Sequence, residues 1–326
     1  MTTTINGSSP SITFSDGSAQ TSATRPFQNR IINGGMSIWQ RGTSSSSIGY
    51  QTVDRWSFYA DSSRTVSRST DVPTGFQYST SLSGTGSTGL TQKIESTNCY
   101  GMAGNSITIS FYLKQTTGAG SNAIGLNLYY ANAADDWSAS TQISTTQNFT
   151  TTSGWAQYSA TFSNMPANSV NGLQVTIVTN SGSAVVFLLT GVQLEVGSTA
   201  TSFDYRPYGT ELALCQRYYF RINPRIGTGD MATGWNATTT TTRTVFYFPV
   251  TMRTAPTALE QSGTAGDYSV RYLLTFTSCS AVPVFYEATT NSGFFELTVA
   301  SGLTAGQGSN LRPVNTSAYL AWSAEL

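Results

Sequence analysis

The sequence contains no histidine, and this absence excludes several kinds of chemistry at once. Without imidazole there is no Ser-His-Asp or Cys-His catalysis, no His-ligated zinc and no imidazole proton shuttle. Any enzymatic reaction would have to use carboxylates. A glycosidase needs two carboxyl groups roughly 5–10 Å apart in a cleft, and the 16 acidic residues form no recognisable motif. We therefore expect a protein that is not an enzyme and that uses no metal and no cofactor.

Charge is also scarce. Only 10% of the residues are charged, and 16 basic residues balance 16 acidic ones. This balance removes the positive surface expected of a nucleic-acid-binding protein. The longest apolar run, residues 184–189, is far shorter than the roughly 20 residues of a membrane-spanning helix. The first residues also lack the charged start and apolar stretch of a secretory signal. We expect no nucleic-acid partner and no membrane insertion.

Cysteine is rare, with Cys99, Cys215 and Cys279 far apart in the sequence. An odd and scattered set does not form a disulfide framework. We expect three reduced, buried thiols. An intermolecular disulfide in an assembled particle is the alternative.

The residues that are abundant favour strands and turns. Ser, Thr and Gly are frequent, and the chain has 17 Tyr and 16 Phe. In many segments apolar residues recur at every second position, as a strand buried on one face requires. These segments are residues 107–113, 124–128, 156–162, 173–177, 192–196, 246–252, 268–276, 295–299 and 320–326. Such strands, separated by Gly-, Ser- and Asn-rich pieces, predict antiparallel sandwiches or jelly rolls.

We therefore predict an all-β protein with two antiparallel, jelly-roll-like β-sandwich domains after a short N-terminal segment. The expected boundaries are 1–28 for the segment, 29–208 for a lectin-like jelly roll and 209–326 for a second sandwich. Residues 211–217 are the one convincing helix former, and we expect them to link the domains. At this junction we expect Arg206 and Arg217 to pair with Glu195 or Glu211.

The N-terminal segment has the pattern of a small hairpin. Ile12 and Phe14 occupy alternate positions, and Asp16-Gly17 follows as a tight-turn signal. One hairpin of this size is not stable alone. We expect sister chains or a docking partner to order it, so that Ile12, Phe14, Asp16 and Gly17 serve particle attachment and trimerisation.

Several blocks of the sequence resemble bacteriophage tail-fibre and related virion fibre proteins, and they occur in that family's order. The opening block is ITFSDGSAQTSA at 12–23, followed by NRIINGGMSIWQRG at 29–42. The most specific part comprises GVQLEVG at 191–197, FDYRP at 203–207 and ELALCQRYY at 211–219. Further similar blocks are residues 54–56, 91–95, 108–114, 250–256 and 322–326.

This resemblance implies a homotrimer with a jelly roll like that of carbohydrate-binding modules, displayed on the virion after synthesis in the host cytoplasm. The implied partners are sister chains, other virion proteins of the tail, baseplate or capsid, and a host cell-surface polysaccharide. The implied function is that of a tail fibre or adhesin. The alternatives are a capsid or baseplate decoration or connector protein without a ligand, a polysaccharide-degrading tailspike enzyme, and a carbohydrate-binding module from outside phages.

Aromatic residues supply the candidate binding site, because sugar rings stack on exposed Trp and Tyr while polar side chains bind the hydroxyls. The candidate glycan-binding residues are Tyr100, Tyr129, Tyr130, Asp135, Asp136, Trp137 and Trp235. Core packing is the competing interpretation for the aromatic residues. For the two aspartates it is a solvated turn, since no calcium-loop spacing surrounds them. Four tryptophans in strand patterns are expected in the core: Trp39, Trp56, Trp155 and Trp322.

Overall fold

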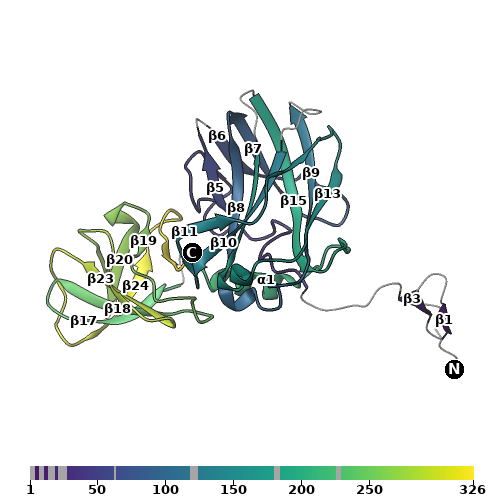
Figure 1. Ribbon diagram of the computed structural model, residues 1–326. Helices are drawn as coiled ribbons and strands as arrows, with labels where there is room; N and C mark the ends of the chain where they lie inside the picture. Colours follow the sequence, from purple (N-terminus) through teal and green to yellow (C-terminus); the bar gives the residue numbers. More distant parts are fainter. Residues whose placement is uncertain are drawn as a thin grey trace.

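The computed structural model describes residues 28–61, 64–117, 124–179, 184–224 and 229–326, and the backbone of three short strands before them. Two all-β sandwiches stand beside each other (Figure 1), one drawn in blue to teal and the other in green to yellow. Their strands pair antiparallel throughout. The predicted all-β fold with two antiparallel sandwiches is confirmed.

The first sandwich consists of two six-stranded sheets. The groove sheet, named here for the site described below, has the order β11 (Asp136–Gln142), β10 (Ile124–Ala133), β14 (Leu173–Thr179), β8 (Thr88–Ile94) and β5 (Ser57–Ala60), and β12 (Gln147–Phe149) also pairs with β10. The opposite sheet has the order β13 (Ala156–Phe162), β9 (Ile107–Thr117), β15 (Ala184–Val196), β7 (Ser79–Thr85), β6 (Arg64–Ser69) and β4 (Ser44–Ser45).

The core of this sandwich follows from the period-two pattern. On β9 the alternate residues Ile107, Ile109, Phe111 and Leu113 are all fully buried, as side chains on one face of a strand are when that face meets another sheet. Leu90, Leu126 and Val175 of the groove sheet belong to the same buried cluster. Each such side chain contributes roughly 1.5–3 kcal/mol through burial.

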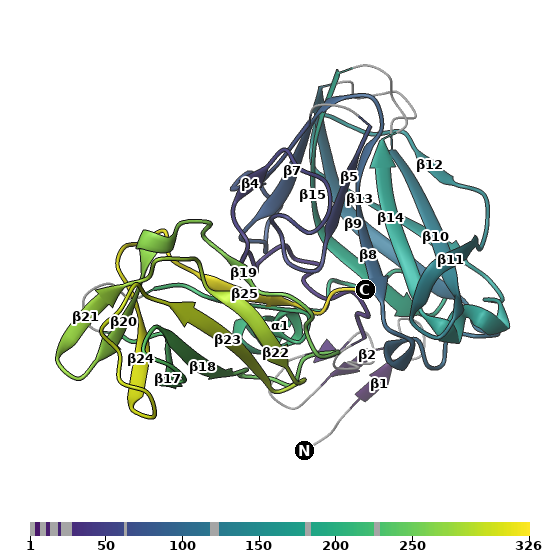
Figure 2. The same cartoon turned by 90° about the vertical axis from the view of Figure 1, so that its left-hand side faces the viewer.

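The second sandwich packs a seven-stranded sheet against a three-stranded one (Figure 2). The larger sheet has the order β21 (Thr275–Ser278), β20 (Tyr268–Tyr272), β24 (Gly308–Pro313), β17 (Ala232–Asn236), β18 (Thr241–Tyr247), β23 (Ser292–Thr298) and β22 (Val284–Ala288). The smaller has the order β16 (Tyr219–Ile222), β25 (Leu320–Ser323) and β19 (Glu260–Gln261). Trp322 on β25 is fully buried and lies against Phe220, Phe246 and Phe295.

Near the N-terminus, β1 (Thr4–Asn6), β2 (Ser11–Thr13) and β3 (Ala19–Gln20) form a three-stranded sheet of their own. The backbone at Ile12 pairs with Ile5 and Gln20. The side chain of Ile12 and the residues Phe14, Asp16 and Gly17 lie outside the described part of the chain. Their roles in attachment and trimerisation stay predictions.

The longest helical element is α1 (Tyr208–Gln216), which begins three residues before the predicted helix. It follows Pro207, which cannot continue a strand ladder and is favoured at helix starts. Three short 3-10 turns complete the helical elements of the described residues: η1 (Ser96–Asn98), η2 (Ala167–Asn171) and η3 (Ala265–Asp267). No helix in these ranges has the length and apolar character to cross a membrane.

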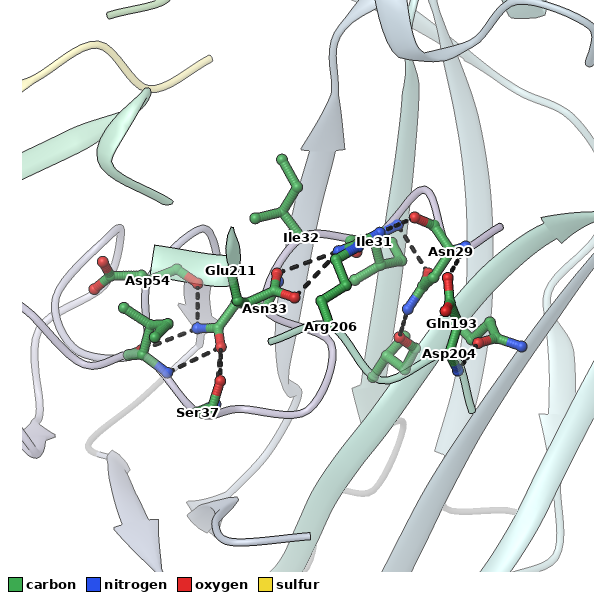
Figure 3. Close-up of polar contacts among 12 residues, drawn as sticks. Asn29, Ile31, Ile32, Asn33, Ser37, Asp54, Gln193, Asp204, Arg206 and Glu211 are labelled. Carbon is green, nitrogen blue, oxygen red and sulfur yellow. Dashed lines mark hydrogen bonds and ion pairs between the residues drawn. The ribbon is translucent and has the colours of Figure 1, made fainter. Parts of the chain in front are cut away.

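A buried polar network fixes α1 to the first sandwich (Figure 3). Arg206 pairs with Glu211 at 3.2 Å and donates to the backbone oxygen of Ile31 at 3.0 Å. Asn29 accepts from the backbone N–H groups of Ile31 and Leu194 at 2.9 and 3.0 Å. The predicted Arg206–Glu211 pair is therefore confirmed. Asn29 connects the segment after residue 28 to β15, and Arg206 connects the same segment to α1.

The prediction for Arg217 is wrong. Arg217 pairs with Glu95 at 3.1 Å, not with Glu195 or Glu211. Glu195 instead accepts hydrogen bonds from the backbone and hydroxyl of Thr201, at 2.8 and 2.7 Å. Arg217 ends α1 and faces the loop after β8, so its partner comes from 122 residues away.

Glu325 joins the two sandwiches through two arginines. Its carboxylate accepts hydrogen bonds from Arg55 and, at 3.3 Å, from Arg41. Arg253 of the second sandwich donates to the backbone oxygens of Ala324 and Glu325 at 2.7 and 2.9 Å. The last residues of the sequence therefore run between the sandwiches, where the C label stands in Figure 1.

Several local expectations need correction. The run 268–276 is not one strand, because β20 and β21 form a hairpin whose turn exposes Leu274 by 95% and leaves Phe276 exposed. The run 246–252 leaves the strand after Tyr247, although Phe248 and Met252 remain buried.

Two of the four tryptophans and all three cysteines are buried as the sequence predicted. Trp56 and Trp322 are in the core as expected, whereas Trp39 and Trp155 are only half-buried and lie outside the strands. Trp39 donates to the backbone oxygen of Met36, and Trp155 to Asp71 at 2.9 Å. The indole N–H of each of these two tryptophans thus has a hydrogen-bond acceptor near the surface. All three cysteines are free and buried, as predicted.

Candidate functional site

A groove of about 540 Å³ lies on the outer face of the groove sheet. Its floor is made by residues that alternate with core residues. On β14, Val175 and Ile177 are buried in the sandwich, while Gln174 and Thr176 between them point outward and are half-buried. The same alternation on β5, β8 and β10 turns one face of each strand to the groove.

The strand register arranges these outward residues in rows across the sheet. One row contains Tyr129, Gln174 and Lys93, which are direct cross-strand partners. The next contains Asn127, Thr176, Thr91 and Ser57. Facing side chains on neighbouring strands lie about 4.5–5.5 Å apart. The floor therefore presents amides and hydroxyls at regular spacing along the direction that crosses the strands.

Hydrogen bonds hold this polar floor in place. The hydroxyls of Thr91 and Thr176 bond to each other at 2.9 Å. Asn127 Oδ1 accepts from Gln142 at 3.2 Å and from Thr146 at 2.6 Å. Because the side chains are fixed by one another, their remaining donors and acceptors are oriented before any ligand arrives.

A third row contains Gly125, Val178, Gly89 and Tyr59. Gly89 packs so closely that an added Cβ would lie 2.4 Å from the backbone oxygen of Ile177. A glycine inside a strand often marks a place where another group approaches the backbone closely. Beside it, the Tyr59 ring is 49% exposed and its hydroxyl donates to Asp61. Because Gly125 and Gly89 have no side chain, the groove is deeper beside the exposed ring of Tyr59.

Tyr50 and Lys93 line the groove at the side of the second sandwich. Burial, followed by the nearby charge of Glu325, raises the pKa of Tyr50 to about 12, so this phenol is neutral at physiological pH. The Lys93 ammonium donates to the backbone oxygen of Leu326 at 3.3 Å and lies 5.2 Å from the centre of the Trp137 ring. Partial burial lowers the pKa of Lys93.

The described residues that line the groove include no Asp and no Glu. Hydrolysis of a glycosidic bond by the usual route requires two carboxyl groups in the same cleft. The described residues also contain no group of three His, Cys, Asp or Glu side chains suited to a metal ion. The arrangement supports binding through stacking and hydrogen bonds.

The structure brings only part of the predicted glycan-binding set to this groove. Tyr129 lines it, and Trp137 reaches it through Lys93. Tyr130, the next residue on β10, turns to the other face and packs against the sandwich core. Trp235 lies on β17 of the second sandwich and is 43% exposed.

The remaining predicted residues have local structural contacts. Asp135 accepts from the backbone and hydroxyl of Ser96 at 2.7 and 2.8 Å, and so holds η1 against the start of β11. Asp136 accepts from the Ser138 N–H at 2.9 Å. Tyr100 stacks under the guanidinium of Arg30, 4.4 Å from its ring centre. Asp135 therefore lies in a turn, as its competing interpretation expected, whereas Asp136 is the exposed first residue of β11.

Sequence reasoning missed most of the groove. The missed residues are Tyr50, Ser57, Tyr59, Thr91, Lys93, Asn127, Gln174 and Thr176. The available signal was the polar half of each alternating strand, for example Thr91 and Lys93 between Leu90 and Ile94. That signal does not say which strands become neighbours.

No protein-family model matches the sequence, and no curated protein matches it. Solved structures give weak likeness to about half of this chain. The enzymatically active domain of tailspike protein 4 from bacteriophage CBA120 is 17% identical, with a TM-score of 0.40 over 53% of this chain and 22% of that chain. The xylan-binding domain of Paenibacillus barcinonensis Xyn10C is 14% identical, with a TM-score of 0.33 over 55% of this chain and 100% of that domain.

A further similar structure is TmCBM61 in complex with β-1,4-galactotriose, at 12% identity and a TM-score of 0.34 over 53% of this chain and 100% of that one. This chain thus spans 22% of the tailspike and the full length of the two smaller proteins.

Proposed function

We propose that this chain is a non-catalytic carbohydrate-binding protein and that the groove on the outer face of the groove sheet is its binding site. The observation that carries the proposal is the lining itself: exposed and half-buried tyrosines, ordered rows of neutral amides and hydroxyls, and no Asp or Glu among the described residues. Tyr59 and Tyr129 offer ring faces to the apolar sides of sugar units. Asn127, Gln174 and Thr176 offer donors and acceptors to the hydroxyls.

We further propose that the protein is a phage fibre subunit that attaches the virion to a host polysaccharide as a homotrimer. The ordered series of fibre-like sequence blocks supports this role, and so does a small N-terminal sheet that forms apart from both sandwiches. Three copies on one axis would raise a weak single-site affinity by avidity. Detection of the chain in purified virions, together with a trimeric mass in solution, tests this part of the proposal.

The binding proposal is tested with an array of bacterial surface polysaccharides, followed by calorimetry on each glycan that binds. Tyr59→Ala and Tyr129→Ala each remove one wall of the groove. We expect each to weaken binding about tenfold, which corresponds to about 1.4 kcal/mol. Tyr247→Ala is the matched control, because Tyr247 is 72% exposed on the second sandwich; it should bind like the unmodified chain.

Two results would contradict the proposal. Equal binding by all three variants would place the site elsewhere. Failure of the unmodified trimer to bind any glycan or any host cell would favour a decoration or connector role without a ligand.

A further inference from the structure

A second hollow lies among loops of the first sandwich and the start of α1. It is a cleft of about 170 Å³ between three segments that are distant in sequence. Gly35 and Ser37 form one side, Phe76 and Gln77 another, and residues 203–211 close it. The two hollows share none of their described lining residues, so this aromatic cleft is separate from the groove.

Aromatic rings build the walls of the aromatic cleft. Phe76 lies 5.0 Å from Phe203 in an edge-on contact, and Phe203 lies 4.9 Å from Tyr205 in another. Phe76 also packs at 5.4 Å on Tyr112, an outward residue of β9. The cluster is therefore anchored on the sheet, while Tyr205 and Tyr208 remain 57% and 62% exposed. Those exposed ring faces are open to a ligand.

The polar floor of the cleft carries no net charge. Arg206 and Glu211 are its two charged residues, and they pair with each other at 3.2 Å (Figure 3). Glu211 also accepts from the backbone N–H of Asn33. Because these two charges pair with each other, the described lining of the cleft has no free cation for an acidic ligand and no free carboxylate to add to the cation–π attraction of an ammonium ligand. The neutral floor selects a neutral ligand with hydroxyl groups.

Gly35 gives the cleft its depth. A Cβ added at this position would stand 3.6 Å from two atoms of the Phe203 ring and 3.8 Å from Phe76. These are ordinary contact distances, so alanine fits there and occupies space that glycine leaves open. The same substitution is therefore a mild and specific way to fill the cleft.

We infer that the aromatic cleft is a second carbohydrate site, which takes a single neutral hexose unit stacked on Tyr205 and Tyr208. A small hollow of two open aromatic faces and a few neutral polar groups suits one sugar ring, whereas the larger groove accommodates several units of a chain. With two separate sites, one protomer would contact two glycan strands at once. This inference goes beyond the proposed function and does not depend on the groove.

The test uses methyl glycosides of glucose, galactose, mannose and N-acetylglucosamine as probes, with saturation-transfer NMR on the full chain. Tyr208→Ala removes an exposed wall at the first position of α1, where alanine is a good helix former. Gly35→Ala fills the floor. We expect each variant to weaken binding of the preferred glycoside about tenfold, and Tyr208→Phe, which keeps the ring, to bind like the unmodified chain.

Controls separate this site from the groove. Tyr247→Ala should leave the glycoside signal unchanged, because Tyr247 lines neither the aromatic cleft nor the groove. A signal lost in Tyr59→Ala but kept in Tyr208→Ala would assign the glycoside to the groove and overturn the inference. Absence of saturation transfer to any of the four probes would overturn it as well.

Discussion

Replacing Glu325 with alanine should strongly destabilise the chain, because two buried arginines would lose their carboxylate. The side chains of Arg55 and Arg41 are 1% and 6% exposed, and that of Glu325 is 6% exposed. Arg55 is also enclosed by the Tyr218 ring, 3.4 Å from its guanidinium carbon, and donates to the backbone oxygen of Lys93 at 2.6 Å. Neither arginine can turn to water without disturbing the junction.

Removing one partner of a buried ion pair costs about 3–5 kcal/mol, because the other charge stays buried without compensation. For a chain of 326 residues, whose unfolding entropy is about 0.7 kcal/mol/K, that loss lowers the melting temperature by about 4–7 °C. Since Glu325 also connects the two sandwiches, we expect the variant to unfold in two resolved transitions. The measurements are differential scanning calorimetry and urea unfolding followed by tryptophan fluorescence.

Glu296→Ala is the matched control. Glu296 pairs with Arg243 at 2.9 Å, but those side chains are 30% and 39% exposed. Exposed pairs contribute about 0–1 kcal/mol, so the control should melt close to the unmodified chain. If the two variants shifted the melting temperature equally, burial of the Glu325 cluster would not govern its strength, and the reasoning would be refuted.

Two further predictions concern a buried carboxyl and a close contact. Burial raises the pKa of Asp54 from 3.8 to about 6, so the folded chain holds an extra proton between those values; the free energy of unfolding should fall by about 3 kcal/mol as pH rises through this window. Asp54→Asn should remove that fall, and an unchanged pH slope would count against the assignment. Gly293→Ala would put a Cβ 2.5 Å from Trp322 Nε1 and should cost about 1–3 kcal/mol in urea unfolding. Gly308→Ala, whose Cβ meets only the Gly234 oxygen at 4.0 Å, should leave the free energy of unfolding nearly unchanged. If both variants lost the same free energy of unfolding, the Trp322 side chain would move aside without cost and the prediction would be wrong.

Strand positions could be predicted because alternation is a local property. Ile107, Ile109 and Phe111 are two residues apart, so their side chains lie on the same face of the strand, and that face is buried. The pattern failed at Leu274, where a leucine pair forms the hairpin turn and Leu273 adopts a φ of 53°. Hairpin turns normally have Gly, Asn or Asp at a position with positive φ. Because this turn has leucine there, the sequence does not indicate it.

The candidate site was less accessible from sequence because it is a property of neighbouring strands. Tyr129 was found as an aromatic residue on an expected solvent face. Thr91 and Gln174 carry no distinguishing chemistry in a chain rich in polar residues, and only the pairing of β8 with β14 brings them together. The same limit explains Arg217, whose partner Glu95 is close in space and remote in sequence.

The strand order has a consequence for synthesis on the ribosome. In both sheets of the first sandwich the last strand made, β14 or β15, is inserted between strands made earlier. The second sandwich repeats this plan with β24 and β25. Until each late strand emerges, its neighbours present unpaired edges, which invite association with other chains. We therefore expect each sandwich to complete its sheets only after its two late strands have been made. A nascent chain halted before residue 184 should depend on chaperones to stay in solution.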